Sequence, residues 1–183
     1  MVQFFAPNTV QSRAMLKRIA LISTGGTIDK TYDEFEGILH NEVSVLDMMI
    51  ASLTLEGIAL ERVAIMNKDS LDMTADDHTL IARTAGDLAA AHDGVVVVHG
   101  TDRLANSGER IFELHPEPPA PIVLTGAMRP YVMRTSDAMQ NFTEALLAVQ
   151  LCAPGVYVAM HNCVLAFPGV VKDRAKGTFV HTG

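Results

Sequence analysis

The chain has 183 residues, of which 49% are hydrophobic and 19% charged, a composition typical of a soluble globular protein and not of a disordered one. Its formal net charge is −7, and no cluster of lysine or arginine interrupts that balance, which argues against nucleic acid or an anionic membrane as a partner. No apolar run approaches the roughly 18 residues of a membrane-spanning helix. Residues 1–18 lack the charge order of a signal peptide, so we expect a cytoplasmic protein.

The two cysteines, Cys152 and Cys163, are too few for a disulfide scaffold. Both flank an apolar run, and we expect them to be buried free thiols.

The first half of the chain alternates predicted strands and helices. We expect residues 1–17 to form an N-terminal arm and residues 18–183 to form one domain. The elements predicted within the domain are a strand at 18–23, an aperiodic loop and candidate lid at 29–41, an amphipathic helix at 43–55 that ends before Gly57, and a strand at 59–66.

The second half continues the same alternation. Thr74, with Asp77 three residues later, predicts the start of a helix that runs to about residue 91. The elements that follow are a strand at 95–98, a helix at 104–114, a proline-rich connector at 115–121, a strand from 122, a helix that starts at Ser136 or Asp137 and runs to 151, and a last strand at 156–160. Strands that alternate with helices predict an α/β fold with a mostly parallel sheet.

Three predicted strands end in short turns rich in threonine and glycine. Because ligands of open α/β sheets collect beyond the carboxyl ends of the strands, these turns predict one composite site. The turns are residues 24–27 (TGGT), 99–102 (HGTD) and 125–130 (TGAMRP).

Nucleotide and metal sites are poorly supported. The chain has neither a GxxxxGK[ST] loop nor a GxGxxG pattern. The histidines are scattered, and His99, His115 and His161 lack ligand spacing with cysteine or carboxylate, so we expect packed or solvated histidines. We therefore predict no metal and no cofactor.

Hydroxyl chemistry remains. Thr27 and Thr101 are expected just beyond the carboxyl ends of adjacent strands, with Asp102 next to Thr101. A threonine is a poor nucleophile unless a neighbour removes its proton, and Tyr32 and Lys172 are candidate activators. Backbone N–H groups of the glycine turns are candidate donors to an oxyanion. On spacing alone, ordinary turn threonines are favoured over a nucleophile.

Taken together, residues 24–28 (TGGTI), 99–102 (HGTD) and 124–130 (LTGAMRP) resemble the signature stretches of bacterial-type L-asparaginases in order and spacing. Further matches extend the resemblance over about residues 18–172: Ser70 with Asp72-Met73, the helix start at Asp137, and Val164-Leu165 followed by Lys172. The resemblance implies the N-terminal α/β domain of that family, a three-layer, flavodoxin-like or Rossmann-like arrangement with helices on both faces of the sheet.

The family hydrolyses the side-chain amide of asparagine, and often of glutamine, without a metal or cofactor. By position, the resemblance implies that Thr27 is the nucleophile and that Thr101, Lys172 and Asp102 handle protons. Asp102 would also pair with the α-ammonium group of the substrate.

The resemblance also implies the remaining substrate contacts. Ser70 and nearby backbone N–H groups would hold the α-carboxylate, and Ala127 would lie near the amide nitrogen. Asp137 would support the Ala127 turn and not touch the substrate. The other expected substrate-binding residues are Gly26, Asp69, Leu71 and Gly100.

The sequence departs from the family in three places. Tyr32, our candidate for the lid tyrosine, follows Thr27 by only five residues, a shorter gap than usual. The chain stops soon after Lys172, so we expect no second C-terminal domain and a homo-oligomer, dimer or tetramer, that completes the site. Leu71 stands where the family often has a polar residue, which predicts a preference for asparagine over glutamine.

The leading hypothesis is an L-asparaginase that acts on a small-molecule amino-acid amide. A second hypothesis keeps the amidohydrolase site but changes the amide substrate, and the lack of a basic surface argues against one carried on tRNA. A third is a non-catalytic amino-acid-binding domain. The presence together of Thr27, Thr101, Asp102 and Lys172 argues against the third.

Overall fold

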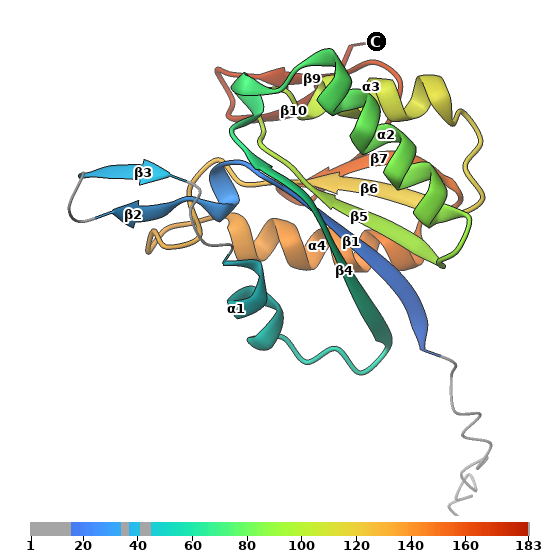
Figure 1. Cartoon of the computed structure of the whole chain (residues 1–183), viewed down its shortest axis with the longest axis horizontal. Helices are drawn as coiled ribbons and strands as arrows, with labels where there is room; N and C mark the ends of the chain where they lie inside the picture. Colours follow the sequence, from blue (N-terminus) through green and yellow to red (C-terminus); the bar gives the residue numbers. More distant parts are fainter. Residues whose placement is uncertain (1–15, 34–36, 41–44, 183) are drawn as a thin grey trace, which may run out of the picture.

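We analysed a computed structural model, which describes residues 16–33, 37–40 and 45–182. Within these ranges, strands and helices alternate for most of the chain (Figure 1). The strands are β1 (Lys17–Gly25), β2 (Thr31–Asp33), β3 (Ile38–His40), β4 (Ile58–Lys68), β5 (Gly94–Val98), β6 (Pro121–Thr125), β7 (Gly155–Met160), β8 (Cys163–Ala166), β9 (Val170–Asp173) and β10 (Thr178–His181). The α-helices are α1 (Leu46–Ala51), α2 (Ala75–Ala89), α3 (Leu104–Leu114) and α4 (Ala138–Leu151), and the short 3₁₀ helices are η1 (Thr27–Asp29) and η2 (Ser70–Asp72).

Six strands form the central sheet in the order β4-β1-β5-β6-β7-β8, and all neighbouring pairs are parallel except β7 and β8. Counted along the chain, the five parallel strands have the order 2-1-3-4-5 of flavodoxin-like folds, whose direction of winding reverses between β1 and β5. Ligands of such sheets bind at that reversal point. The predicted α/β fold with a mostly parallel sheet is confirmed.

Helices cover both faces of this sheet, as expected for parallel strands that are apolar on every side (Figure 1). Helices α2 and α3 pack on one face over Ile22, Val97 and Leu124. Helices α1 and α4 cover the other face, where Leu21 and Val96 are fully buried. The residues of β5 and β6 are all buried, because these are the two middle strands of the sheet.

Several predicted elements match closely. The helix predicted at 104–114 is α3, and the helix predicted from Thr74 is α2. Thr74 and Asp77 form a reciprocal capping box: the Thr74 hydroxyl accepts from the Asp77 N–H, and the Asp77 carboxylate accepts from the Thr74 N–H. Asp137 occupies the position before α4, but its carboxylate does not cap that helix.

Two predictions were wrong in part. The stretch predicted as an aperiodic loop begins at the last residue of η1 and holds the antiparallel hairpin of β2 and β3, which projects from the body of the molecule in Figure 1. The predicted helix before Gly57 ends already at Ala51, because the Ser52 hydroxyl donates to the carbonyl of Met49 and competes with helix continuation. After residue 160, where no element was predicted, the chain forms β8 and a second hairpin, β9 and β10, held by the buried side chains of Val170 and Phe179.

The expected arm at residues 1–17 lies outside the described residues except for its last two. No helix in the described part of the chain is long and apolar enough to cross a membrane. Both cysteines are free, but the prediction that both are buried was wrong. Cys152 is half-buried, and Cys163 is exposed because it starts β8, the edge strand of the sheet.

Candidate active site

The carboxyl ends of β1, β5 and β6 lie level with one another. Ser23 pairs with Val98, and Val98 pairs with Thr125, so the three threonine-glycine turns leave the sheet in one row. The hydroxyl of Thr24 donates to the carbonyl of Val98 at 3.0 Å and fastens the first turn to the second. The predicted convergence of the three turns is therefore present in the structure.

The first two turns touch through their glycines. Gly26 has φ +85°, and a Cβ atom built on it would lie 2.4 Å from both N and Cα of Gly100. A side chain at position 26 would therefore be strained and would overlap the second turn. Thr27 follows Gly26 directly and is half-buried as the first residue of η1, so it starts one residue away from the contact with the turn that carries Thr101.

A third segment, which follows β4, contacts the same two turns. A Cβ atom on Gly100 would lie 2.6 Å from Oγ of Ser70, which is buried. Asp69 precedes Ser70, accepts from the Leu71 N–H at 3.0 Å and pairs with Nζ of Lys30 at 2.7 Å. The Lys30 contact, and then the bond from Leu71, lower the pKa of Asp69, so this carboxylate is charged at neutral pH. Lys30 thus ties η1 to η2, although nothing in the sequence indicated this pair.

Thr101, Lys172 and Asp102 form one hydrogen-bonded cluster. Nζ of Lys172 lies 2.8 Å from Oγ1 of Thr101 and 3.0 Å from Oδ1 of Asp102. Thr101 is buried, and the side chains of Lys172 and Asp102 are only 15% and 26% exposed. A proton can pass directly between an amine and a hydroxyl at 2.8 Å, so this cluster has the geometry of a general acid–base pair held by a carboxylate.

Arg174 is a contact that the sequence analysis missed. One of its guanidinium nitrogens lies 3.2 Å from Oδ1 of Asp102, the oxygen that also receives Lys172. Arg174 lies in the turn just after β9, where strand alternation does not apply, so its position two residues after Lys172 did not indicate this contact. Asp102 therefore forms ion pairs with two cations, Lys172 and Arg174.

A hydrogen-bonded network of buried side chains, formed by His99, Ser107 and His78, supports the second turn. The carbonyl of Gly100 only accepts, so Nδ1 of His99 carries the proton that binds it at 2.8 Å. Burial lowers the pKa of His99 to about 4. The imidazole is therefore neutral, and its Nε2 accepts from the hydroxyl of Ser107 at 2.7 Å. Ser107 in turn accepts from Nδ1 of His78 at 2.7 Å. Each hydrogen bond of this network therefore has one defined donor and one defined acceptor.

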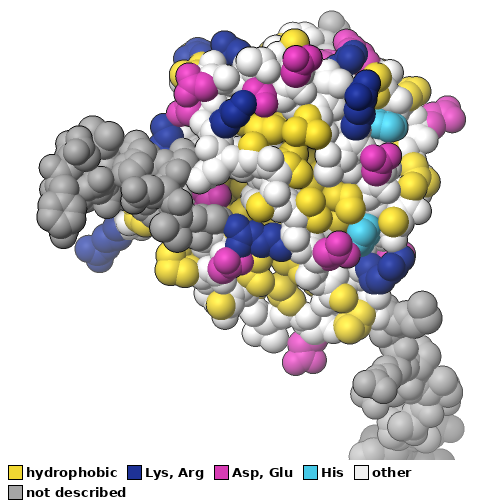
Figure 2. Space-filling view, in the orientation of Figure 1, with side chains coloured by type: hydrophobic (Ala, Val, Ile, Leu, Met, Phe, Trp, Pro, Cys, Tyr) yellow, Lys and Arg dark blue, Asp and Glu magenta, His cyan; other side chains and the backbone are white. Residues whose placement is uncertain are grey.

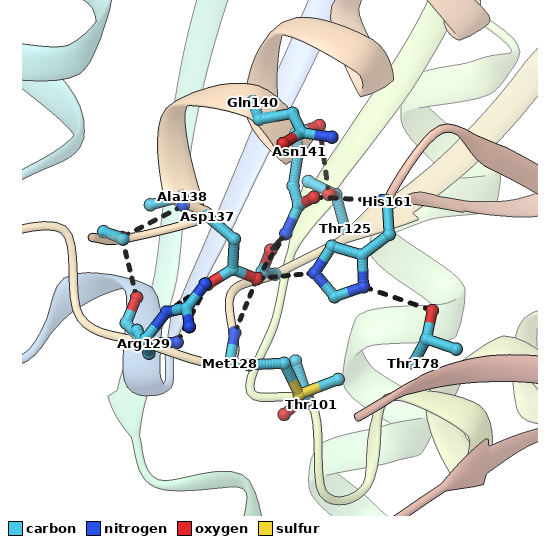
Figure 3. A network of polar contacts seen from close by, with 12 residues as sticks. Thr101, Thr125, Met128, Arg129, Asp137, Ala138, Gln140, Asn141, His161 and Thr178 are labelled. Carbon is cyan, nitrogen blue, oxygen red and sulfur yellow. Dashed lines mark hydrogen bonds and ion pairs between the residues drawn. The ribbon is translucent and has the colours of Figure 1, made fainter. Parts of the chain in front are cut away.

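Asp137 holds the third turn (Figure 3). Its two carboxylate oxygens accept from the backbone N–H groups of Met128 and Arg129, each at 3.0 Å, and one of them also receives His161 at 2.8 Å. Burial raises the pKa of Asp137, but the hydrogen bonds from Met128, His161 and Arg129 outweigh it and lower the pKa overall. The prediction that Asp137 supports the Ala127 turn is confirmed by these bonds.

The structure brings most of the predicted site residues to one edge of the sheet. Tyr32 lies in β2 and pairs with Leu39, but its side chain lies outside the described part of the molecule. Leu71 is beside the site and is 52% exposed. The predicted residues joined by the contacts above are Gly26, Asp69, Ser70, Leu71, Gly100, Thr101, Asp102, Lys172 and, through the turn held by Asp137, Ala127; Thr27 is next to Gly26 in the chain.

The chemistry available is that of hydroxyls, an amine and a carboxylate. Among the residues that the structure describes, no three histidine, cysteine or acidic side chains come together in a way that suits a metal ion. Two threonines on touching turns, with an amine beside one of them, suit acyl transfer by a hydroxyl nucleophile.

Comparison with known proteins gives a consistent result. A family model described as "Asparaginase, N-terminal" matches residues 18–179. The chain is 32% identical over 162 residues to an L-asparaginase of Thermococcus kodakarensis, an alignment that covers 87% of this chain and 49% of that protein. It is 35% identical over 158 residues to a subunit of the glutamyl-tRNA(Gln) amidotransferase of Haloquadratum walsbyi, with 85% and 36% covered.

Solved structures agree. The thermostable L-asparaginase from Thermococcus kodakarensis superposes with a TM-score of 0.79 at 29% identity, and a probable cytoplasmic L-asparaginase from Campylobacter jejuni with 0.73 at 29% identity. Each superposition covers 90% of this chain and 51% of the other. The chain spans about half the length of these L-asparaginases.

Proposed function

Because the chain belongs to the asparaginase family, we propose that it hydrolyses the side-chain amide of L-asparagine to L-aspartate and ammonia. The observation that supports this proposal is the backbone contact of Gly26 with Gly100, since Thr27 directly follows Gly26 and Gly100 belongs to the turn of the Thr101–Lys172–Asp102 cluster. A nucleophile and a proton-handling pair on two touching turns are the parts that amide hydrolysis needs.

In the proposed reaction, Oγ1 of Thr27 attacks the side-chain amide carbon and its proton passes to the Lys172–Thr101 pair. The C–N bond breaks, the nitrogen leaves as ammonia with a proton from the Lys172–Thr101 pair, and an aspartyl ester remains on Thr27. Water then attacks the ester, which releases aspartate and restores the threonine hydroxyl. Backbone N–H groups of the glycine turns stabilise the negative oxygen in both steps. We keep Tyr32 as the lid residue that assists Thr27.

Substrate recognition follows from the charges around the site. Asp102 binds the α-ammonium group, and Ser70 with the backbone N–H groups around it binds the α-carboxylate. The apolar and exposed side chain of Leu71 offers no hydrogen bond to the longer glutamine, so we propose that asparagine is preferred. Comparable kcat/KM values for the two amides would contradict this preference.

The test of the reaction is ammonia release by the purified protein with asparagine and with glutamine. Wild-type protein is expected to release ammonia from asparagine, and Thr27→Ala to lose that activity while it keeps its circular dichroism spectrum and still binds aspartate. Binding of asparagine without turnover by the wild type would instead identify a binding domain.

A second candidate is an amidohydrolase that acts on glutamine. It is favoured by the relative that is called a subunit of glutamyl-tRNA(Gln) amidotransferase, which is as similar to this chain as the L-asparaginase is. Faster ammonia release from glutamine than from asparagine in the same assay would select this candidate.

We further propose that the protein is a cytoplasmic homo-oligomer. Leu147 and Leu151 of α4 and Val164 of the edge strand β8 are 57%, 75% and 48% exposed, and they line one shallow apolar cavity. Apolar side chains beside an open sheet edge favour self-association. Light scattering coupled to size-exclusion chromatography is expected to give the mass of a dimer or tetramer, and a monomer mass would contradict the proposal.

A further inference from the structure

A cavity beside the Thr101–Lys172–Asp102 cluster is lined mainly by basic side chains. Its volume of about 490 Å³ falls in the range of small-molecule sites. Within the described part of the chain, none of its lining residues is acidic. The lining residues come from the turn after β6, the turn after β7 and the hairpin of β9 and β10, and they are Met128, Arg129, His161, Lys172, Arg174, Lys176 and Gly177.

The charges around this cavity do not balance. Four lysine or arginine side chains line it, whereas their carboxylate contacts are Asp102, Asp137 and Asp173, all outside the lining. Asp102 is the ion-pair partner of two of the four cations, Lys172 and Arg174. Asp137 lies 3.9 Å from Nε of Arg129, and its oxygens are already taken by backbone N–H groups and His161. Among the described residues, at least one positive charge therefore exceeds the anions that face it.

This excess is a local feature of a protein whose net charge is −7. On the face seen in Figure 2, basic and acidic side chains are interspersed. A cavity of similar size between α2 and α3, of about 530 Å³, has a mixed lining: Arg110 pairs with Glu113 at 3.0 Å, and Glu109 is present as well. The basic cavity thus differs from the other in charge and not in size.

Two of the basic side chains can turn toward a ligand. Arg174 and Lys176 are 74% and 70% exposed, and their ion pairs with Asp102 and Asp173 span 3.2 and 3.5 Å. Exposed ion pairs of this kind are weak, so either cation can exchange its carboxylate for a ligand oxygen. The guanidinium of Arg174 also has the fork of donors that suits a carboxylate or phosphate.

We propose that this cavity binds a small multivalent oxyanion, a dicarboxylate or a phosphate, next to Lys172. Such a ligand fills the space between Arg129 and the tip of the β9–β10 hairpin and supplies the missing negative charge. It also draws Arg174 away from Asp102, which couples the cavity to the neighbouring cluster. The binding itself does not depend on the proposed hydrolysis, because the excess charge exists without any reaction.

The test uses the full chain labelled with ¹⁵N and two probes, inorganic phosphate and malonate. Both titrations are followed by the chemical shifts of backbone amides. Saturable shifts are expected at Met128, Arg129, Lys176 and Gly177, with none at Arg110. Tighter binding of malonate assigns the site to carboxylates, and tighter binding of phosphate assigns it to phosphates.

Variants establish which charges matter. Arg174→Gln and Lys176→Gln are each expected to weaken binding about tenfold, the effect of losing one charged donor. The matched control Arg110→Gln, in the cavity of mixed charge, is expected to leave the affinity unchanged. Raising NaCl from about 50 to 200 mM should weaken binding, since exposed charges are screened.

Three results would overturn the proposal: no saturable shift with either probe at millimolar concentration, shifts spread over the whole surface, or equal weakening by Arg110→Gln and Lys176→Gln. Ammonia release from asparagine is measured separately on the same samples. An inactive protein that still binds phosphate or malonate would refute the proposed hydrolysis and leave this inference intact. An active protein that binds neither anion would support the hydrolysis and refute this inference.

Discussion

Gly26 and Gly100 are in backbone contact across the point where the winding of the sheet reverses. A Cβ atom on Gly26 would come within 2.4 Å of two backbone atoms of Gly100, and neither atom belongs to a side chain that can turn away. The distance between the Thr27 turn and the Thr101 turn is therefore set by backbone packing. Two glycines determine the geometry that the proposed reaction uses.

Gly26→Ala is expected to lower the free energy of unfolding by about 3 kcal/mol, from a side chain at positive φ together with overlap against a packed backbone. Urea denaturation measures this loss. Asparagine turnover is expected to fall more than the folded fraction does, because the two turns move apart.

Gly177→Ala is the matched control. Gly177 also has positive φ, +62°, but no described atom lies within 4 Å of a Cβ built there. Only the conformational strain remains, about 1 kcal/mol. Equal losses in the two variants would show that the Gly26–Gly100 contact does not constrain the site.

The three strand-end turns were predictable because glycine and threonine after an apolar run carry a local signal. The valine run at 95–98 and the turn after it are where the sequence analysis expected them. By contrast, the hairpin of β2 and β3 has too few residues to show the alternation of a strand, and its pairing of Thr31 with His40 is not visible in either segment alone.

Contacts between distant residues were the part that the sequence could not predict. Ser107 lies eight residues after His99, and His78 lies on another helix. No local pattern in the sequence therefore indicated that the three side chains form one hydrogen-bonded network. The basic cavity was missed for the same reason. Arg129 lies far from Lys172 in the sequence, and a count of charges along the chain does not detect side chains that the fold brings together.

His99 predicts a pH dependence of stability. Its pKa falls from 6.5 in the unfolded chain to about 4 in the fold, because burial disfavours the charged form. Between these values the unfolded state binds more protons, so the free energy of unfolding decreases as the pH falls from about 6.5 to about 4. The decrease from His99 amounts to roughly 3 kcal/mol. Burial and Arg103 also lower the pKa of His78, which adds in the same direction.

Urea denaturation at about pH 7.5 and about pH 5 measures this slope. His99→Gln removes the titrating group and is expected to be less stable at the higher pH but to depend less on pH. His181→Gln, at an exposed histidine, is the control and is expected to keep the wild-type slope. An unchanged slope in His99→Gln would contradict the assignment.

Asp137→Asn tests the support of the third turn. Both carboxylate oxygens accept a backbone N–H, and the side chain is only 5% exposed, so the amide group of asparagine would face one N–H donor without an acceptor. We expect a loss of about 2 kcal/mol in the free energy of unfolding and a lower kcat for asparagine.

Asp173→Asn is the control for this change, because Asp173 also accepts two backbone N–H groups, but both bind the single oxygen Oδ1, which asparagine retains. Its side chain is also less buried, at 24% exposed against 5% for Asp137. Its melting temperature is expected to match that of the wild type. A melting temperature of Asp137→Asn within error of the wild type would rule out the supporting role.

Arg174→Gln tests the shared carboxylate of Asp102. In the proposed complex the α-ammonium group of asparagine pairs with Asp102, where it competes with the guanidinium of Arg174. Removal of this exposed cation is expected to lower KM for asparagine by about two- to fivefold and to leave kcat nearly unchanged. Steady-state kinetics beside Arg110→Gln measure the effect, and a raised KM would show that Arg174 helps to bind the substrate.

The central claim is that Thr27 forms a covalent ester with the acyl group of the substrate. Its most direct test is peptide mass spectrometry of protein mixed with asparagine and quenched in acid during turnover. We predict an aspartyl adduct on the peptide that contains Thr27 and no adduct on the peptide that contains Thr101. An adduct on Thr101 alone, or full ammonia release by Thr27→Ala, would contradict the account.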